Sequence, residues 1–108
     1  MKRVFIIPID KMNQRVSFEF NANNNKHLVE FMYNNQSDRI IFSISSSGKR
    51  VLSGKVVQTE YPYITNQGFA VIFKNKSRSE FYPNLENIST VRFEVNDSWT
   101  RDKADILQ

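Results

Sequence analysis

A chain of 108 residues, of which 40% are apolar, has room for one domain built around a single hydrophobic core. The absence of cysteine excludes disulfide bonds, a thiolate nucleophile and cysteine-ligated zinc. The formal net charge of +4 fits a binder of nucleic acid or of another anionic surface, but acidic residues are interspersed with the basic ones along most of the chain, which also fits a mixed solvated surface.

The N-terminal part of the chain predicts two strands. Residues 3–9 are almost continuously apolar, and residues 14–21 alternate so that Val16, Phe18 and Phe20 share one face. Because only a short turn separates the two runs, we expect them to pair as a hairpin. The first run is too short for a signal peptide, and no stretch approaches the about 20 apolar residues that span a bilayer, so we expect a cytoplasmic protein without a membrane segment.

The middle of the chain predicts an antiparallel meander. An asparagine-rich turn at residues 21–26 precedes a strand at residues 27–34, and two further strands follow at residues 40–45 and 51–57. Gly48 lies in the turn between the last two, where a positive φ suits glycine. Alternation places one set of apolar side chains on a common face: Ile40, Phe42 and Ile44.

The C-terminal half is less regular. Residues 58–67 contain Tyr-Pro-Tyr and predict an irregular connection, whereas residues 68–74 are apolar on both faces and predict a central strand. A loop over residues 75–89 then leads to a last strand at residues 90–96. About seven short strands without a long amphipathic helix predict an all-β fold, a small antiparallel β-barrel or sandwich. We expect one domain over residues 1–96 and a tail over residues 97–108 that forms a short helix or a strap.

The sequence contains no recognisable catalytic group. His27 is the only histidine and stands beside a turn, while Glu19 and Glu30 lie on polar strand faces, where solvated charges explain them. No phosphate-binding loop, dinucleotide fingerprint, metalloprotease motif or nucleophile elbow occurs. We therefore expect no enzyme and no catalytic, cofactor-binding or metal-binding residue.

Two sets of residues are candidates for binding. The local basic cluster consists of Lys74, Lys76 and Arg78, next to aromatic residues, and such a combination can hold single-stranded nucleic acid on a small barrel. The alternative is a polar hairpin tip. Aromatic residues outside the predicted strands are candidates for contacts with other proteins, or else anchors of their own loops: Tyr61, Tyr63, Tyr82 and Trp99.

Several short motifs follow one another in a distinctive order. A proline-containing strand at residues 5–9 is followed by Phe-Met-Tyr-Asn at residues 31–34 and a Ser-Gly turn at residues 47–48. Pro-Asn-Leu at residues 83–85 then precedes the closing strand at residues 91–95. This order resembles the small baseplate plug-like proteins of contractile-tailed bacteriophages.

The resemblance implies a structural component of a phage tail or baseplate. Such a protein packs at the tube or hub and helps to assemble or plug it, with no turnover and no cofactor. Its partners would be tube, hub or ring subunits, repeated by the symmetry of the assembly, with no role for a membrane. It would be assembled in the host cytoplasm and end in the virion tail. A small basic β-barrel that binds single-stranded nucleic acid is the alternative function.

Overall fold

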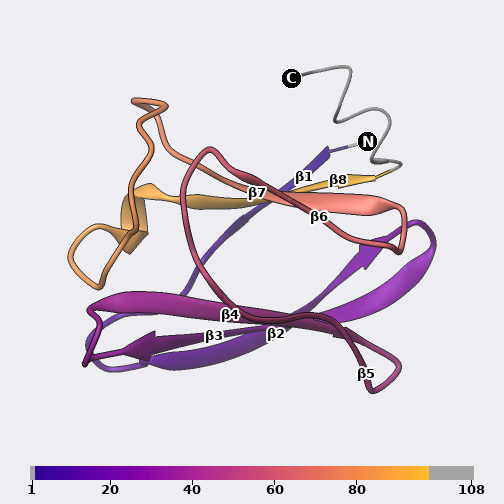
Figure 1. Ribbon diagram of the computed structural model, residues 1–108, viewed down its shortest axis with the longest axis horizontal. Coiled ribbons are helices and arrows are strands. Elements are labelled where there is room, and N and C mark those ends of the chain that lie inside the picture. Colours follow the sequence, from indigo (N-terminus) through magenta and orange to yellow (C-terminus); the bar gives the residue numbers. More distant parts are fainter. Residues whose placement is uncertain (1, 98–108) are drawn as a thin grey trace.

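The computed structural model describes residues 2–97, which form two four-stranded antiparallel sheets packed face to face (Figure 1). The predicted all-β class is confirmed, and the architecture is a sandwich. A 3₁₀ turn, η1, spans Ile88–Thr90. The eight strands of the described chain are β1 (Lys2–Ile6), β2 (Arg15–Ala22), β3 (Asn25–Asn34), β4 (Arg39–Ser46), β5 (Lys49–Val56), β6 (Pro62–Ile64), β7 (Phe69–Lys74) and β8 (Arg92–Asp97).

One sheet has β2, β3, β4 and β5 in sequence order, so the predicted three-strand meander is confirmed and β2 is added to it. Tight turns join its strands, because their residues adopt left-handed backbone conformations: Asn23 and Asn24 have φ of 51° and 65°, and Gly48 has φ of 78°. Phe31 pairs with Phe42 in the register of β3 and β4, which places both rings on the buried face. Period-two alternation thus gives β2, β3 and β4 one apolar face each, whereas β5 is mostly exposed and pairs with β4 in an irregular register.

The other sheet has the order β1-β8-β7-β6. β7 lies between two neighbours, as its two apolar faces predict. The expectation of an irregular connection over residues 58–67 is wrong in part, because β6 pairs with β7 and places Tyr63 opposite Val71. Three residues that include a proline are too few to show a period-two pattern. β8 extends to Asp97, and the rest of the predicted tail lies outside the described residues.

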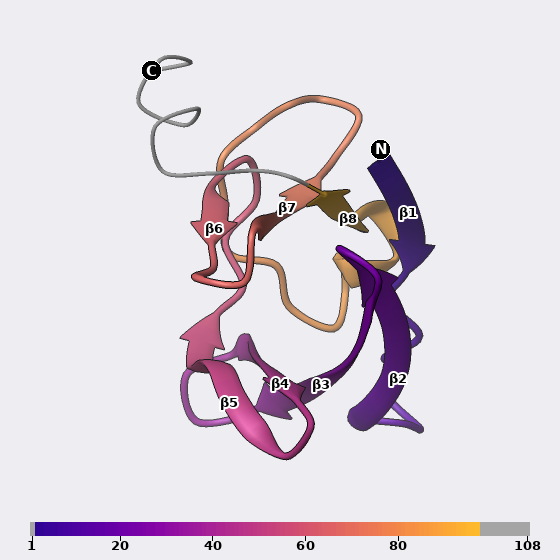
Figure 2. The same cartoon turned by 90° about the vertical axis from the view of Figure 1, so that its right-hand side faces the viewer.

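The predicted hairpin of the first two strands is also wrong. β1 pairs with β8 and β2 pairs with β3, so the two strands belong to different sheets (Figure 2). The residues between them cross from one sheet to the other and bury Ile7 and Ile9. Across the sandwich, the ring centroids of Phe5 and Phe18 lie 5.5 Å apart. A short apolar strand gains as much burial from facing its sequence neighbour as from pairing with it.

The core between the sheets is built largely from phenylalanine. Phe93 lies at its centre and is fully buried. Offset and edge-to-face contacts of this kind stabilise aromatic cores beyond the area that they bury. The Phe93 ring centroid lies between 5.5 and 6.0 Å from those of five other rings, which come from both sheets: Phe5, Phe18, Phe20, Phe31 and Phe73.

Candidate interaction surfaces

Two tyrosines expose large parts of their rings near β6. Tyr61 immediately precedes this strand and is 52% exposed, while Tyr82 lies in the loop after β7 and is 46% exposed. The guanidinium of Arg39 lies 5.1 Å from the centroid of the Tyr82 ring, within the range of a cation–π contact. We call Tyr61, Tyr82 and Arg39 the tyrosine surface. Aromatic rings and arginine are the side chains that interface cores favour.

Tyr63 lies between these residues and the core. Its ring packs edge-on against Phe42, with centroids 4.9 Å apart, and its hydroxyl donates a hydrogen bond to the carbonyl oxygen of Val56. The same hydroxyl accepts a bond of 3.1 Å from the backbone N–H of Gln58. Burial is the main reason why the pKa of Tyr63 is raised to about 12; the hydrogen bond from Gln58 opposes this rise, and the nearby phenols of Tyr61 and Tyr82 contribute to it. Tyr63 thus uses its hydroxyl inside the domain.

The loop that carries Tyr82 is tied to the opposite sheet by Asp38 in the β3–β4 turn. Asp38 accepts hydrogen bonds from the Tyr33 hydroxyl, at 2.7 Å, and from the Asn84 side-chain amide, at 3.0 Å. These two bonds hold the pKa of Asp38 below its ordinary value, and the bond to Asp38 raises the pKa of Tyr33. The turn and the loop therefore position Arg39 and Tyr82 next to each other.

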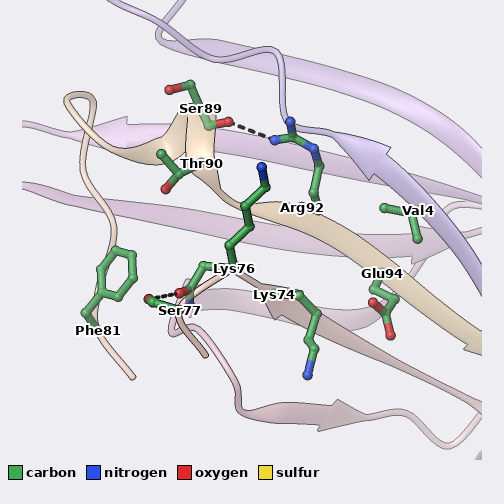
Figure 3. Close-up of a pocket in the computed structure, with 10 residues that line it drawn as sticks. Val4, Lys74, Lys76, Ser77, Phe81, Ser89, Thr90, Arg92 and Glu94 are labelled. Atoms are coloured by element: carbon green, nitrogen blue, oxygen red, sulfur yellow. Dashed lines mark hydrogen bonds between the residues drawn. The ribbon is translucent and has the colours of Figure 1, made fainter. Parts of the chain in front are cut away.

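The outer face of the β1-β8-β7-β6 sheet carries a hollow of about 730 Å³ (Figure 3). It lies between this face and the segment that connects β7 to β8. In β8 the outward-facing Arg92 and Glu94 alternate with the inward-facing Phe93 and Val95, which explains why charged side chains reach the hollow. Its lining consists of Val4, Lys74, Asn75, Lys76, Ser77, Phe81, Ser89, Thr90, Arg92 and Glu94.

The cations around the hollow differ in their partners. The Nζ atom of Lys74 lies 2.9 Å from a carboxylate oxygen of Glu60. In Figure 3 the Lys74 side chain points away from those of Lys76 and Arg92. Arg92 donates to the backbone oxygen of Ser89 at 2.7 Å. Within residues 2–97, no carboxylate oxygen lies within 4.0 Å of the nitrogens of Lys76 or Arg92. The hollow therefore has two cations without an acidic partner in the described chain.

The structure brings together only part of the predicted residues. Lys74 and Lys76 of the basic cluster line the hollow, whereas Arg78 does not. Arg92 was not a predicted site residue, because only the pairing of β7 with β8 places it opposite Lys74. Of the predicted aromatic residues, Tyr61 and Tyr82 offer exposed rings, Tyr63 is half-buried, and Trp99 lies outside the described residues. Their role as an interface stays a prediction.

His27 is an internal packing residue of β3. Only 2% of it is exposed, and its ring centroid lies 4.6 Å from that of Phe69 and 5.4 Å from that of Phe20. Its Nε2 lies 3.2 Å from the carbonyl oxygen of Ala22.

Over residues 2–97, no group of three or more histidine and acidic side chains could hold a metal ion, and no helix is long and apolar enough to cross a membrane.

Comparison with known families gives a match over nearly the whole described chain. The model of a family described as "Cyanophage baseplate Pam3 plug gp18" matches residues 4–98. No curated protein matches the sequence. The matched region begins within β1 and continues past the end of β8, so it covers both sheets, the tyrosine surface and the hollow.

Proposed function

The chain belongs to the family of the cyanophage baseplate plug, and on this premise we propose that it packs at the tube or hub of a phage baseplate and helps to assemble or plug it. The family expected from the order of motifs is thereby confirmed, and the family is one of structural baseplate proteins. The observation that carries the proposal is the extent of the match, which leaves no strand of the sandwich outside it.

A plug of this kind acts by being held in place, and the sandwich supports that role. Its aromatic core makes the domain a rigid body, because densely packed interiors deform little. The tyrosine surface offers ring area at the open edge where β6 ends its sheet. Buried tyrosine and arginine side chains carry much of the binding energy of protein interfaces. Tube, hub or ring subunits, repeated by the symmetry of the tail, are the partners that we propose for it.

Charge supports the proposal in a second way. The net charge of +4 allows the surface to meet acidic surfaces of other tail proteins, and complementary charge accelerates docking and sets its register. The chain would meet these partners in the host cytoplasm during assembly and remain with them in the virion tail.

The test is incorporation into tails. The full chain, carrying a tag, is produced together with the tail genes of its phage, and the tails are purified through another subunit. We expect the chain to co-purify with them, and tails made without it to show an open lumen in electron micrographs. Complete tails that contain none of the chain would refute the proposal.

Tyr61→Ser combined with Tyr82→Ser examines the proposed interface. We expect this pair to lower incorporation at least tenfold, since exposed rings cost little to the fold but much to a contact. The matched control is Met12→Ser, because Met12 is 89% exposed and lies in the β1–β2 connection. Equal incorporation of the double variant and the control would show that the interface does not include these two tyrosines.

A further inference from the structure

The hollow on the outer face of the β1-β8-β7-β6 sheet combines charge with apolar surface. Val4 of the edge strand β1 is 53% exposed and forms part of its lining, together with the half-buried Phe81. Lys76 makes no hydrogen bond or ion pair within the described chain, and Arg92 bonds only to backbone oxygens there. Figure 3 shows the Lys76 and Arg92 side chains at the same hollow. A ligand that fits both features carries negative charge on an otherwise apolar stem.

We propose that the hollow receives an acidic segment of a neighbouring baseplate protein. An aspartate or glutamate carboxylate of that segment lies between the ammonium of Lys76 and the guanidinium of Arg92, and its apolar neighbours lie on Val4 and Phe81. Charge-assisted hydrogen bonds to a carboxylate are stronger than neutral ones, and they satisfy cations that have no acidic partner in residues 2–97. This inference rests on the proposed function, since it names the chemistry of one partner of the plug.

A protein segment fits the hollow better than a nucleic acid does. A single strand of nucleic acid needs a basic groove that follows several phosphates. Here Lys74 is neutralised by Glu60, and Arg78 lies outside the lining. Two neighbouring cations can bind a single carboxylate, whereas a nucleic-acid strand needs cations along several consecutive phosphates.

The first test identifies the occupant by photocrosslinking in assembled tails. The photoreactive residue p-benzoylphenylalanine replaces Val4 in one full-length variant and Tyr61 in another. After irradiation we expect the Val4 variant to form a crosslink to a tail protein, at a peptide with aspartate or glutamate within a few residues of the crosslinked site. A crosslinked peptide without acidic residues would overturn the inference, and so would a crosslink to nucleic acid.

The variant with the label at Tyr61 separates this inference from the proposed function. Crosslinking at Tyr61 with none at Val4 would overturn the acidic-segment site and leave the baseplate role intact. Complete tails that contain neither the labelled variants nor the unlabelled parent chain would refute the baseplate role itself.

The second test reverses the charge. Lys76→Glu should lower incorporation into tails at least tenfold, whereas Lys49→Glu, the same change at the exposed β4–β5 hairpin of the other sheet, should leave it unchanged. Changing the acidic residue that lies near the crosslinked site of the partner to lysine should restore the incorporation of Lys76→Glu. Thermal unfolding of both variants verifies that they fold alike. Equal incorporation of the two variants would overturn the inference.

Discussion

Two tyrosines on either side of Pro62 have opposite environments. The Tyr63 hydroxyl bonds to the backbone of Val56 and Gln58, while Tyr61 is 52% exposed. Tyr63→Phe removes one donor and leaves the carbonyl and the N–H without this partner. We expect it to lower the free energy of unfolding by about 1–2 kcal/mol. Tyr61→Phe is the matched control and should change it by less than about 0.5 kcal/mol in urea titrations. Equal effects would show that the buried hydroxyl contributes nothing specific.

The same residue predicts a dependence of stability on alkaline pH. The pKa of Tyr63 rises from 10.0 to about 12 on folding, chiefly because burial disfavours the phenolate. The folded state therefore keeps its proton where the unfolded state loses it. The stabilisation is complete below about pH 10 and is lost as the pH rises toward 12. Urea titrations at pH 9 and pH 11.5 should show that the free energy of unfolding falls more between these two pH values in the parent protein than in Tyr63→Phe. An equal loss in both would contradict the assignment.

His27 contributes packing. His27→Ala removes a ring that lies between Phe20 and Phe69 and leaves the carbonyl oxygen of Ala22 without this partner. We expect a loss of ~2–4 kcal/mol in the free energy of unfolding, from the cavity and the lost hydrogen bond together. Lys26→Ala, at the exposed neighbouring position, is the control. A His27 variant as stable as this control would show that the ring is dispensable.

At the scale of the elements, the turns join the two sheets as well as the strands within them. Asn23, in the β2–β3 turn, donates from its side-chain amide to the backbone oxygens of Gln67 and Gly68, at 3.0 and 2.8 Å. These residues form the turn between β6 and β7, in the other sheet. Asn23 is compatible with its φ of 51° because a short polar side chain tolerates the left-handed region.

Gly68→Ala tests this link. Gly68 has φ of +83°, and an added Cβ would lie 2.3 Å from Nδ2 of Asn23, which would displace the amide from both of its acceptors. Gly48→Ala is the matched control, because Gly48 has φ of +78° and an added Cβ would meet nothing within 4 Å. Backbone strain alone should lower the free energy of unfolding of the control by about 1–2 kcal/mol, and Gly68→Ala should lower it by about 1–2 kcal/mol more. Equal losses in urea titrations would show that the contact adds no stability.

At the scale of the whole molecule, one aromatic cluster belongs to both sheets. Phe93→Ala opens a cavity where rings of β1, β2, β3 and β7 meet. We expect this variant to lower the free energy of unfolding by about 3–5 kcal/mol, a large share of the stability of a domain this small. The unfolding transitions followed by far-ultraviolet and near-ultraviolet circular dichroism should remain coincident, because neither sheet keeps a core of its own. Two separate transitions would show that the sheets unfold independently.

Most strands of the described chain, though not β6, were predictable from the sequence, and so were the buried faces of those that alternate. Alternation is a local property, so residues such as Phe42 and Ile44 could be assigned to one buried face before any strand had a partner. The left-handed turns at Asn23, Asn24 and Gly48 followed from residue type in the same way. The order of short motifs also predicted the family, which the family model confirms over residues 4–98.

Only the tertiary structure decided which strands pair and what their outer faces present. β1 could have paired with β2 on its pattern alone, but it joins β8, far along the chain, and so faces β2 across the core. That pairing, together with the pairing of β7 with β8, brings Val4 and Arg92 to the same hollow as Lys76. Side-chain alternation specifies which residues are buried, whereas partner choice depends on contacts between distant segments, and no local pattern encodes those.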